Sequence, residues 1–339
     1  MGVRVFVAAS VLLCAAGGSA AAQSAQSPPI RVELHGRMHF QWNSTSVGAD
    51  ETVLGAAIAP STFEHRRVRL SADVQVSDWI RGRVEPELSM GGNIRLRNAW
   101  VALVLDPSLT VRAGQFKKPF NAIFATSGSE VPAIERAVRI RGLETALRKA
   151  TPEGVLRDFR GVPLVGESEA LLETQQYTGY DMGVAVEARR GAVALTAGVF
   201  NGNGPDTRDD NAGVSAAARA TWSADPGVPL VLGGAWSRRV VNWPLPQSLD
   251  TRSGDAFVAD VQLGGYRRGL WLLAEAATGD NLASEERFVG AHAMLALFNA
   301  VEGRRIEGWE PVARVSWGDP DRTVTGDEGV LVTPGLNIY

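Results

Sequence analysis

Cysteine is nearly absent from this 339-residue sequence, and its one example, Cys14, lies close to the N-terminus. The rest of the chain therefore has no disulfide framework, thiolate nucleophile or cysteine-ligated metal. Long apolar runs are also lacking, because no run beyond the N-terminus reaches the roughly 18 residues that a transmembrane helix needs. Basic residues are not in excess, with 34 Lys and Arg against 37 Asp and Glu. A nucleic-acid partner is not expected, and any membrane crossing must use strands.

The N-terminus has the features of an export signal. Arg4 provides a positive charge, Val5 to Ala16 form a short apolar stretch, and Ala20-Ala21-Ala22 resembles a cleavage site. The alternative is a buried N-terminal helix, but the apolar stretch is short and its flanks are typical of a signal. We predict that residues 1–22 are a cleaved signal peptide and that residues 23–339 form the mature domain.

Apolar and polar residues alternate strictly from Ile30 to Asn43. A period of two places one set on each face of a β-strand. The apolar set is Ile30, Val32, Leu34, Gly36, Met38, Phe40 and Trp42, and the polar set is Arg31, Glu33, His35, Arg37, His39, Gln41 and Asn43. One face of this predicted strand is therefore charged and the other is apolar.

The alternation recurs along the chain, giving about thirteen candidate strands. It is clear in 67–76, 80–90 and 94–104, and weaker in 180–187, 214–222 and 309–317. In 94–104 we expect Trp100, Ala102 and Val104 to share the apolar face, opposite Arg95 and Arg97. Several strands run to about ten residues, the length of tilted membrane-crossing strands, whereas strands of soluble sandwiches average about 5–6. The pattern predicts an all-β fold, a transmembrane antiparallel β-barrel, with a soluble β-protein as the alternative.

The connections fit a barrel with short turns at one end and long loops at the other. Ser77-Asp78 and Asp106-Pro107-Ser108 are short breaks, while 44–61, 201–211 and 242–254 are long polar ones. Residues 120–176 show no sustained alternation. We interpret this segment as a long irregular loop that folds into the pore and narrows it; the alternative is an extracellular excursion.

Several runs resemble the phosphate-selective porin O/P family, over most of the chain from Arg31 onward. They are Arg66-Arg67-Val68-Arg69-Leu70, Arg97-Asn98-Ala99-Trp100-Val101, Val111-Arg112-Ala113-Gly114-Gln115-Phe116-Lys117-Lys118-Pro119-Phe120, Glu135-Arg136 and Gly198-Val199-Phe200-Asn201-Gly202-Asn203-Gly204. The resemblance implies a 16-stranded antiparallel barrel, a homotrimer, a loop at the constriction, and passage of phosphate or related anions. Members of that family continue through further strands beyond a Pro-Gly break like the one before Asn337, so we expect this sequence to lack the last strands; the alternative is that the barrel closes with strands that the alternation does not reveal.

Arginines gather on the predicted lumen face. The alternation places six of them there as candidate pore-lining, anion-attracting residues, namely Arg67, Arg69, Arg81, Arg83, Arg95 and Arg97. Rings of basic residues are how anion pores are built. The irregular segment adds candidate constriction residues, namely Lys117, Lys118, Arg136, Arg139 and Arg141. The alternative is that the arginines pair with Glu33, Asp73, Glu85 and Glu87 and stabilise the wall without favouring anions.

Candidates for catalysis or metal binding are few. His35 and His39 share a predicted strand face without a third metal ligand, so we interpret them as lumen-lining. Residues 201–211 are rich in Asp and Asn but lack the ordered spacing of a calcium loop, which favours a solvated loop. No Gly-x-Ser-x-Gly elbow or Gly-Lys-Ser/Thr phosphate loop is present. We predict no enzyme activity, no metal and no cofactor.

The combined reading is a porin of the Gram-negative outer membrane that lets small hydrophilic solutes diffuse passively. We expect a preference for anions, with phosphate or polyphosphate as candidate solutes. The expected partners are outer-membrane lipid, small anionic solutes and, by the resemblance, two further copies of the chain. The alternatives are a structural or adhesive outer-membrane barrel without conductance, and a secreted soluble β-protein.

Overall fold

The structure is a computed structural model, and it describes most of the chain beyond the N-terminus. The described residues are 30–44, 52–53, 56–57, 61–88, 94–133, 136, 168–207, 209, 213–245, 248–303 and 305–339. The predicted signal peptide, residues 1–22, lies outside them, as do Arg139 and Arg141 of the predicted constriction.

Among the described residues a single sheet of fifteen strands dominates the fold, and every pair of neighbouring strands is antiparallel. Its members are β1 (Arg31–Ser44), β4 (Ser61–Gln75), β5 (Ile80–Leu88), β6 (Ile94–Asp106), β7 (Leu109–Lys117), β8 (Tyr180–Arg190), β9 (Val193–Phe200), β10 (Ser215–Ala224), β11 (Leu230–Leu245), β12 (Ser248–Gly264), β13 (Leu270–Asn281), β14 (Glu286–Leu297), β15 (Asn299–Ala300), β16 (Gly308–Asp319) and β17 (Gly329–Ile338). A separate small hairpin joins β2 (Thr52–Val53) and β3 (Ala56–Ala57).

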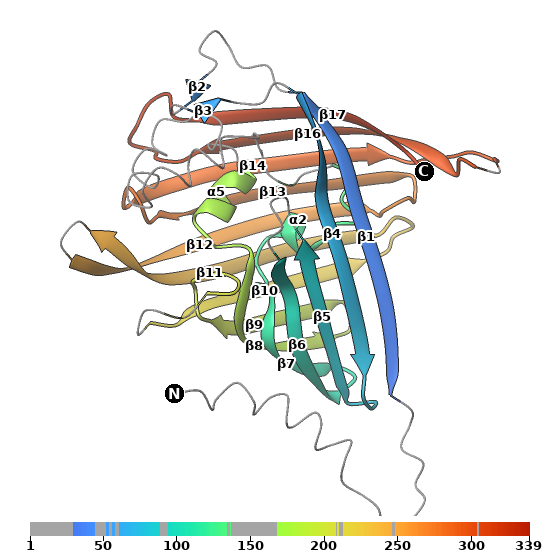
Figure 1. The fold of residues 1–339 in the computed structure, drawn as a ribbon, viewed down its shortest axis with the longest axis horizontal. Helices are drawn as coiled ribbons and strands as arrows, with labels where there is room; N and C mark the ends of the chain where they lie inside the picture. The colour runs from blue at the N-terminus through green and yellow to red at the C-terminus, as the bar shows by residue number, and fades with distance from the viewer. Residues whose placement is uncertain are drawn as a thin grey trace, which may run out of the picture.

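Strand order follows the sequence, so each long strand pairs with the next long strand along the chain. The sheet curves strongly, and β1 and β4 cross the view steeply while β12 to β17 run along it (Figure 1). β1 and β17 lie at the two ends of the strand order, and no pairing joins them within the described residues. The described part of the chain thus contributes fifteen strands to the sheet, where the family resemblance implies sixteen.

The two faces of the sheet differ in chemistry, as the alternation predicts. We call the face toward the helices the inner face and the opposite one the outer face. Large apolar side chains are exposed on the outer face, for example Leu34 at 79% and Met38 at 62%. Charged side chains such as Arg67 and Glu87 are buried on the inner face. Apolar outside and polar inside is typical of a transmembrane barrel, which confirms the predicted fold class.

The predicted faces of β6 are wrong beyond Arg97. A β-bulge interrupts the pairing between β5 and β6, because Glu85 pairs with Asn98 while Pro86 pairs with Leu96. The extra residue reverses the alternation. Ala102 is therefore buried on the inner face, where Trp100 is partly buried, while Val101 and Leu103 are exposed. Pro86 has no backbone N–H to donate, which favours the irregularity at this position.

The predicted long loop at 242–254 is also wrong. β11 and β12 remain paired as far as Leu245 and Ser248, so their hairpin extends well past the apolar part of both strands. In the extension of β12, polar residues occupy successive positions, Thr251, Arg252 and Ser253, and this removes the alternation by which a strand is recognised.

Within the described residues, two short helices lie on the concave side of the sheet, α2 (Ala122–Ala125) and α5 (Ser168–Thr174) (Figure 1). We call the described residues 118–133, 136 and 168–179 the inward segment. Within the described part of the chain, no helix is both long and apolar enough to cross a membrane.

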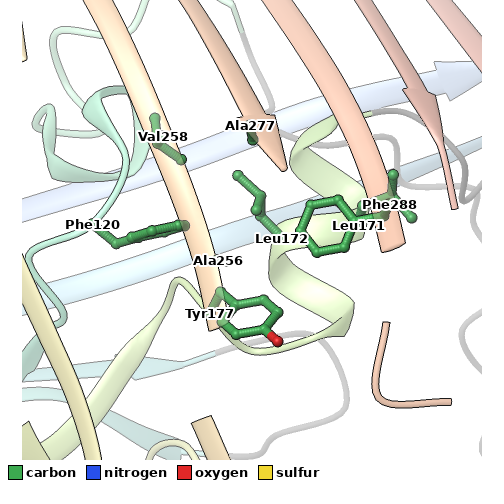
Figure 2. Close-up of a cluster of buried hydrophobic side chains, with 8 residues drawn as sticks. All are labelled: Phe120, Leu171, Leu172, Tyr177, Ala256, Val258, Ala277 and Phe288. Atoms are coloured by element: carbon green, nitrogen blue, oxygen red, sulfur yellow. The ribbon is translucent and has the colours of Figure 1, made fainter. Parts of the chain in front are cut away.

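The inward segment packs on the inner face of β12, β13, β14 and β16. Leu171 and Leu172 of α5 lie among aromatic side chains, including Tyr177 and Phe288, as Figure 2 shows. Phe120 completes this cluster against Val258 of β12. A second apolar cluster places Ile123 of α2 against Trp271, Leu273 and Met294. Both halves of the inward segment are therefore docked by apolar burial rather than lying free.

Candidate functional site

Charges on the inner face of β4, β5 and β6 form a connected network. Arg69 donates from Nε to Glu87, and Arg97 Nη2 lies 2.5 Å from Oε1 of the same carboxylate. Arg69 Nη1 is 3.7 Å from Oε1 of Glu85. Glu87 is only 1% exposed, so it lies almost fully covered between two guanidinium groups. The strand register pairs Arg69 with Glu87, whereas Arg97 lies at the β-bulge of β6 and reaches the same carboxylate from there.

Arg83 extends this network toward β4. It lies 3.3 Å from Asp73 and 2.7 Å from Glu85. Three of the six predicted pore-lining arginines are thus neutralised by carboxylates on adjacent strands. Of the other three, Arg67 is buried, Arg95 is partly buried and Arg81 is exposed. For Arg69, Arg83 and Arg97, the alternative stated from the sequence therefore applies, in which arginines pair with carboxylates of the wall.

Glu87→Gln is expected to unbalance this network. The change removes the charge shared by Arg69 and Arg97 but keeps the shape of the side chain. We expect a loss of about 1–3 kcal/mol in the free energy of unfolding, the usual cost of leaving buried partners unsatisfied. We also expect a stronger preference for anions, because two guanidinium charges lose their counter-charge. Chemical denaturation in detergent and reversal potentials in a KCl gradient measure the two effects; an unchanged reversal potential would show that these arginines do not face the ion path.

The predicted constriction residues hold the inward segment by its carbonyl groups. Lys117 Nζ donates to the carbonyl oxygens of Phe124 and Thr126, at 2.7 and 3.1 Å. Arg136 donates to the carbonyl oxygens of Ile123 and Thr126, at 2.8 and 2.7 Å. The C-terminal end of α2 therefore has its unpaired carbonyl groups satisfied by two cations.

Lys118 is held at the second half of the same segment. Its Nζ donates to the carbonyl oxygen of Gln176 and lies 3.9 Å from Oδ2 of Asp181. Burial lowers the pKa of the Lys118 ammonium to about 8. These contacts give Lys117, Lys118 and Arg136 a positioning role in the structure.

Two guanidinium groups converge on Gly128. A Cβ atom at this glycine would lie 3.2 Å from Nη2 of Arg37 and 3.4 Å from Nη2 of Arg136. Arg37 comes from the polar face of β1 and forms no ion pair among the described residues. The sequence pattern put Arg37 on the predicted lumen face, but nothing local distinguished it from the arginines that are paired.

The inner wall fixes the inward segment with further basic side chains. Arg219 forms two contacts with Asp260, at 2.7 and 2.9 Å, and donates to the carbonyl oxygen of Phe120 at 2.9 Å. Arg239 and Arg314 donate to the carbonyl oxygens of Gln175 and Arg136, at 2.9 and 2.7 Å. Sequence reasoning missed these residues. The sequence feature that could have indicated them is an isolated charged residue within a strand whose other residues are mostly small or apolar.

No group of three or more His, Cys, Asp or Glu side chains is arranged to hold a metal ion within the described residues. The inner face therefore carries paired charges along β4 to β6, two guanidinium groups beside Gly128, and the docked inward segment.

Comparison with known proteins gives a family and several distant structures. The family model for phosphate-selective porin O and P matches residues 33–265. A loop L8 deletion mutant of OmpT, an outer membrane protein of Vibrio cholerae, is 13% identical, with 91% of this chain and 99% of that chain covered and a TM-score of 0.38. A mutant of the Rh. blastica porin is 12% identical, with 92% and 100% covered and a TM-score of 0.34. OpdQ from Pseudomonas aeruginosa is 10% identical, with 91% and 97% covered and a TM-score of 0.28. No curated protein matches significantly.

The family match spans the whole region from β1 through the inward segment to β12, and it includes the charge network and the residues around Gly128. The chain therefore belongs to the phosphate-selective porin O and P family of outer-membrane porins.

Proposed function

We propose that this protein is a non-enzymatic diffusion porin that prefers small anions. The observation that carries the proposal is the convergence of Arg37 and Arg136 on Gly128 of the inward segment. Arg37 has no carboxylate partner among the described residues, unlike Arg69, Arg83 and Arg97. Its charge is therefore available to a passing solute.

The inward segment gives this charge its effect. The segment packs on β12 to β16 and reaches across to Arg37 of β1, so a solute passing beside it meets the basic groups at short range. Walls of low dielectric strengthen such a field by excluding water from one side. A guanidinium group is planar and stays charged, and its donors match the oxygens of phosphate. Phosphate and polyphosphate are therefore the solutes that we propose, bound weakly enough to leave again.

We propose the following export route, membrane location and assembly for the protein. The chain is exported by the signal at residues 1–22, crosses the outer membrane with its strands, and assembles as a homotrimer. The exposed apolar side chains of the outer face, such as Leu34 and Met38, would contact lipid.

Single-channel recording from purified, refolded protein in planar bilayers tests the proposal. We expect stepwise conductance, a reversal potential on the anion side in a KCl gradient, and a lower chloride current when phosphate is added. Steps with cation preference would overturn the role of Arg37. Folded, membrane-inserted protein without any steps would favour a structural barrel.

A further inference from the structure

Asn121 lies at the junction of the two halves of the inward segment and the barrel wall. It is 1% exposed. Its Nδ2 donates to both carboxylate oxygens of Glu169, at 3.1 and 3.0 Å, and to Oε1 of Glu275 at 3.2 Å. Its Oδ1 accepts a hydrogen bond from Thr178 Oγ1 at 2.6 Å. One amide side chain therefore links β13 to α5 and to the residues that precede β8.

Glu275 continues the same link into α2. Its Oε2 accepts from the backbone N–H groups of Ala122 and Ile123, at 3.1 and 3.4 Å. Glu275 is 4% exposed and is the residue of β13 that pairs with Asp260 on β12. Asp260 is committed to Arg219, which in turn donates to the carbonyl oxygen of Phe120. The start of α2 is therefore tied to the wall on both sides of Asn121.

Glu169 and Glu275 bring two buried carboxylates to one amide group. A buried carboxylate is costly unless hydrogen-bond donors surround it, and two beside each other repel. The amide group of Asn121 donates hydrogen bonds to both carboxylates. These bonds offset the repulsion and link Glu169 to Glu275. An acceptor in its place would leave three oxygen-bearing acids facing one another.

We propose that Asn121 is the positioning residue of the constriction, which bridges Glu169 and Glu275 and so holds both halves of the inward segment at a fixed place in the lumen. The inference rests on the proposed porin function, because it assumes that solutes pass beside this segment. Asn121 touches no solute; it acts through the residues that it fixes.

Asn121→Asp tests the bridge with almost no change in shape. The new carboxylate repels Glu169 and Glu275, and we expect the inward segment to leave its position for part of the time. In single-channel records, the ratio of time at altered conductance levels to time at the main level should rise at least about tenfold, a change that corresponds to only about 1.4 kcal/mol. Heat-modifiable mobility on gels should stay that of a folded barrel, because the strand pairings are untouched.

The double variant Asn121→Asp with Glu275→Gln restores a donor to the site and should return the records toward those of wild type. Asn299→Asp, which makes the same substitution in the short strand β15, away from the inward segment, is the matched control and should conduct as wild type. Wild-type conductance in Asn121→Asp would overturn the positioning role. So would a double variant that is a folded barrel but does not return the conductance records toward those of wild type. A wild-type protein without conductance would instead overturn the proposed function itself.

Discussion

Replacing Arg37 with glutamate is expected to abolish the anion preference of the pore or to reverse it. Arg37 is the inner-face arginine whose guanidinium meets Arg136 at Gly128 without a carboxylate partner among the described residues. The substitution changes the local charge by two units beside Gly128 of the inward segment.

The size of the effect follows from Coulomb's law. Two unit charges about 4 Å apart interact by about 1 kcal/mol in bulk water and about 4 kcal/mol at an effective dielectric constant near 20. A change of two charges should therefore lower the anion-to-cation permeability ratio at least about tenfold, since tenfold corresponds to about 1.4 kcal/mol. The measurement is the reversal potential in a KCl gradient.

Two further variants show whether the effect depends on the charge at position 37 and on its location. Arg37→Lys keeps the charge and should keep the sign of the reversal potential, with weaker block by phosphate because an ammonium lacks the planar donor pair. Arg190→Glu changes the charge by the same amount at an exposed position at the end of β8, and it should have little effect. A wild-type reversal potential in Arg37→Glu would contradict the role given to Arg37.

Gly233→Val is expected to be among the most destabilising single changes in the barrel wall. A Cβ atom at Gly233 would lie 2.5 Å from Nη2 of Arg219 and 2.5 Å from Oδ2 of Asp260. The absence of a side chain lets Arg219 reach across β11 to Asp260 on β12. Any side chain therefore separates a buried ion pair and also disturbs the bond from Arg219 to the carbonyl oxygen of Phe120.

Breaking a buried ion pair costs about 3–5 kcal/mol, and we expect a loss of this order in the free energy of unfolding of Gly233→Val. Denaturant titration in detergent measures it. Gly234→Val is the matched control, because a Cβ there would meet its nearest atom, the carbonyl oxygen of Val258, at 3.9 Å. Equal stability losses in the two variants would show that the steric account of the Arg219–Asp260 pair is wrong.

The faces of most strands could be predicted from the sequence because the two-residue period of a strand is a local property. Trp317 and Val315 are exposed, and Arg314 and Ser316 are buried, as the alternation along β16 requires. The same holds for Leu70 and Arg67 on β4. The alternation failed at the bulge that reverses β6 and in the paired extensions of β11 and β12, where no period of two is present.

By itself, the sequence determined that this protein is a sheet of alternating strands with an apolar outer face, a charged inner face and one long irregular segment. It did so because the alternation of apolar and polar side chains depends only on neighbouring residues within one strand. Only the tertiary structure decided which charges are cancelled: Arg69 meets Glu87 through strand register and Arg97 reaches it from the bulge of β6, while Arg37 and Arg136 both lie beside Gly128. It also decided where the irregular segment rests, because Asn121, Glu169 and Glu275 come from separate parts of the chain and become neighbours only when the sheet curves around them.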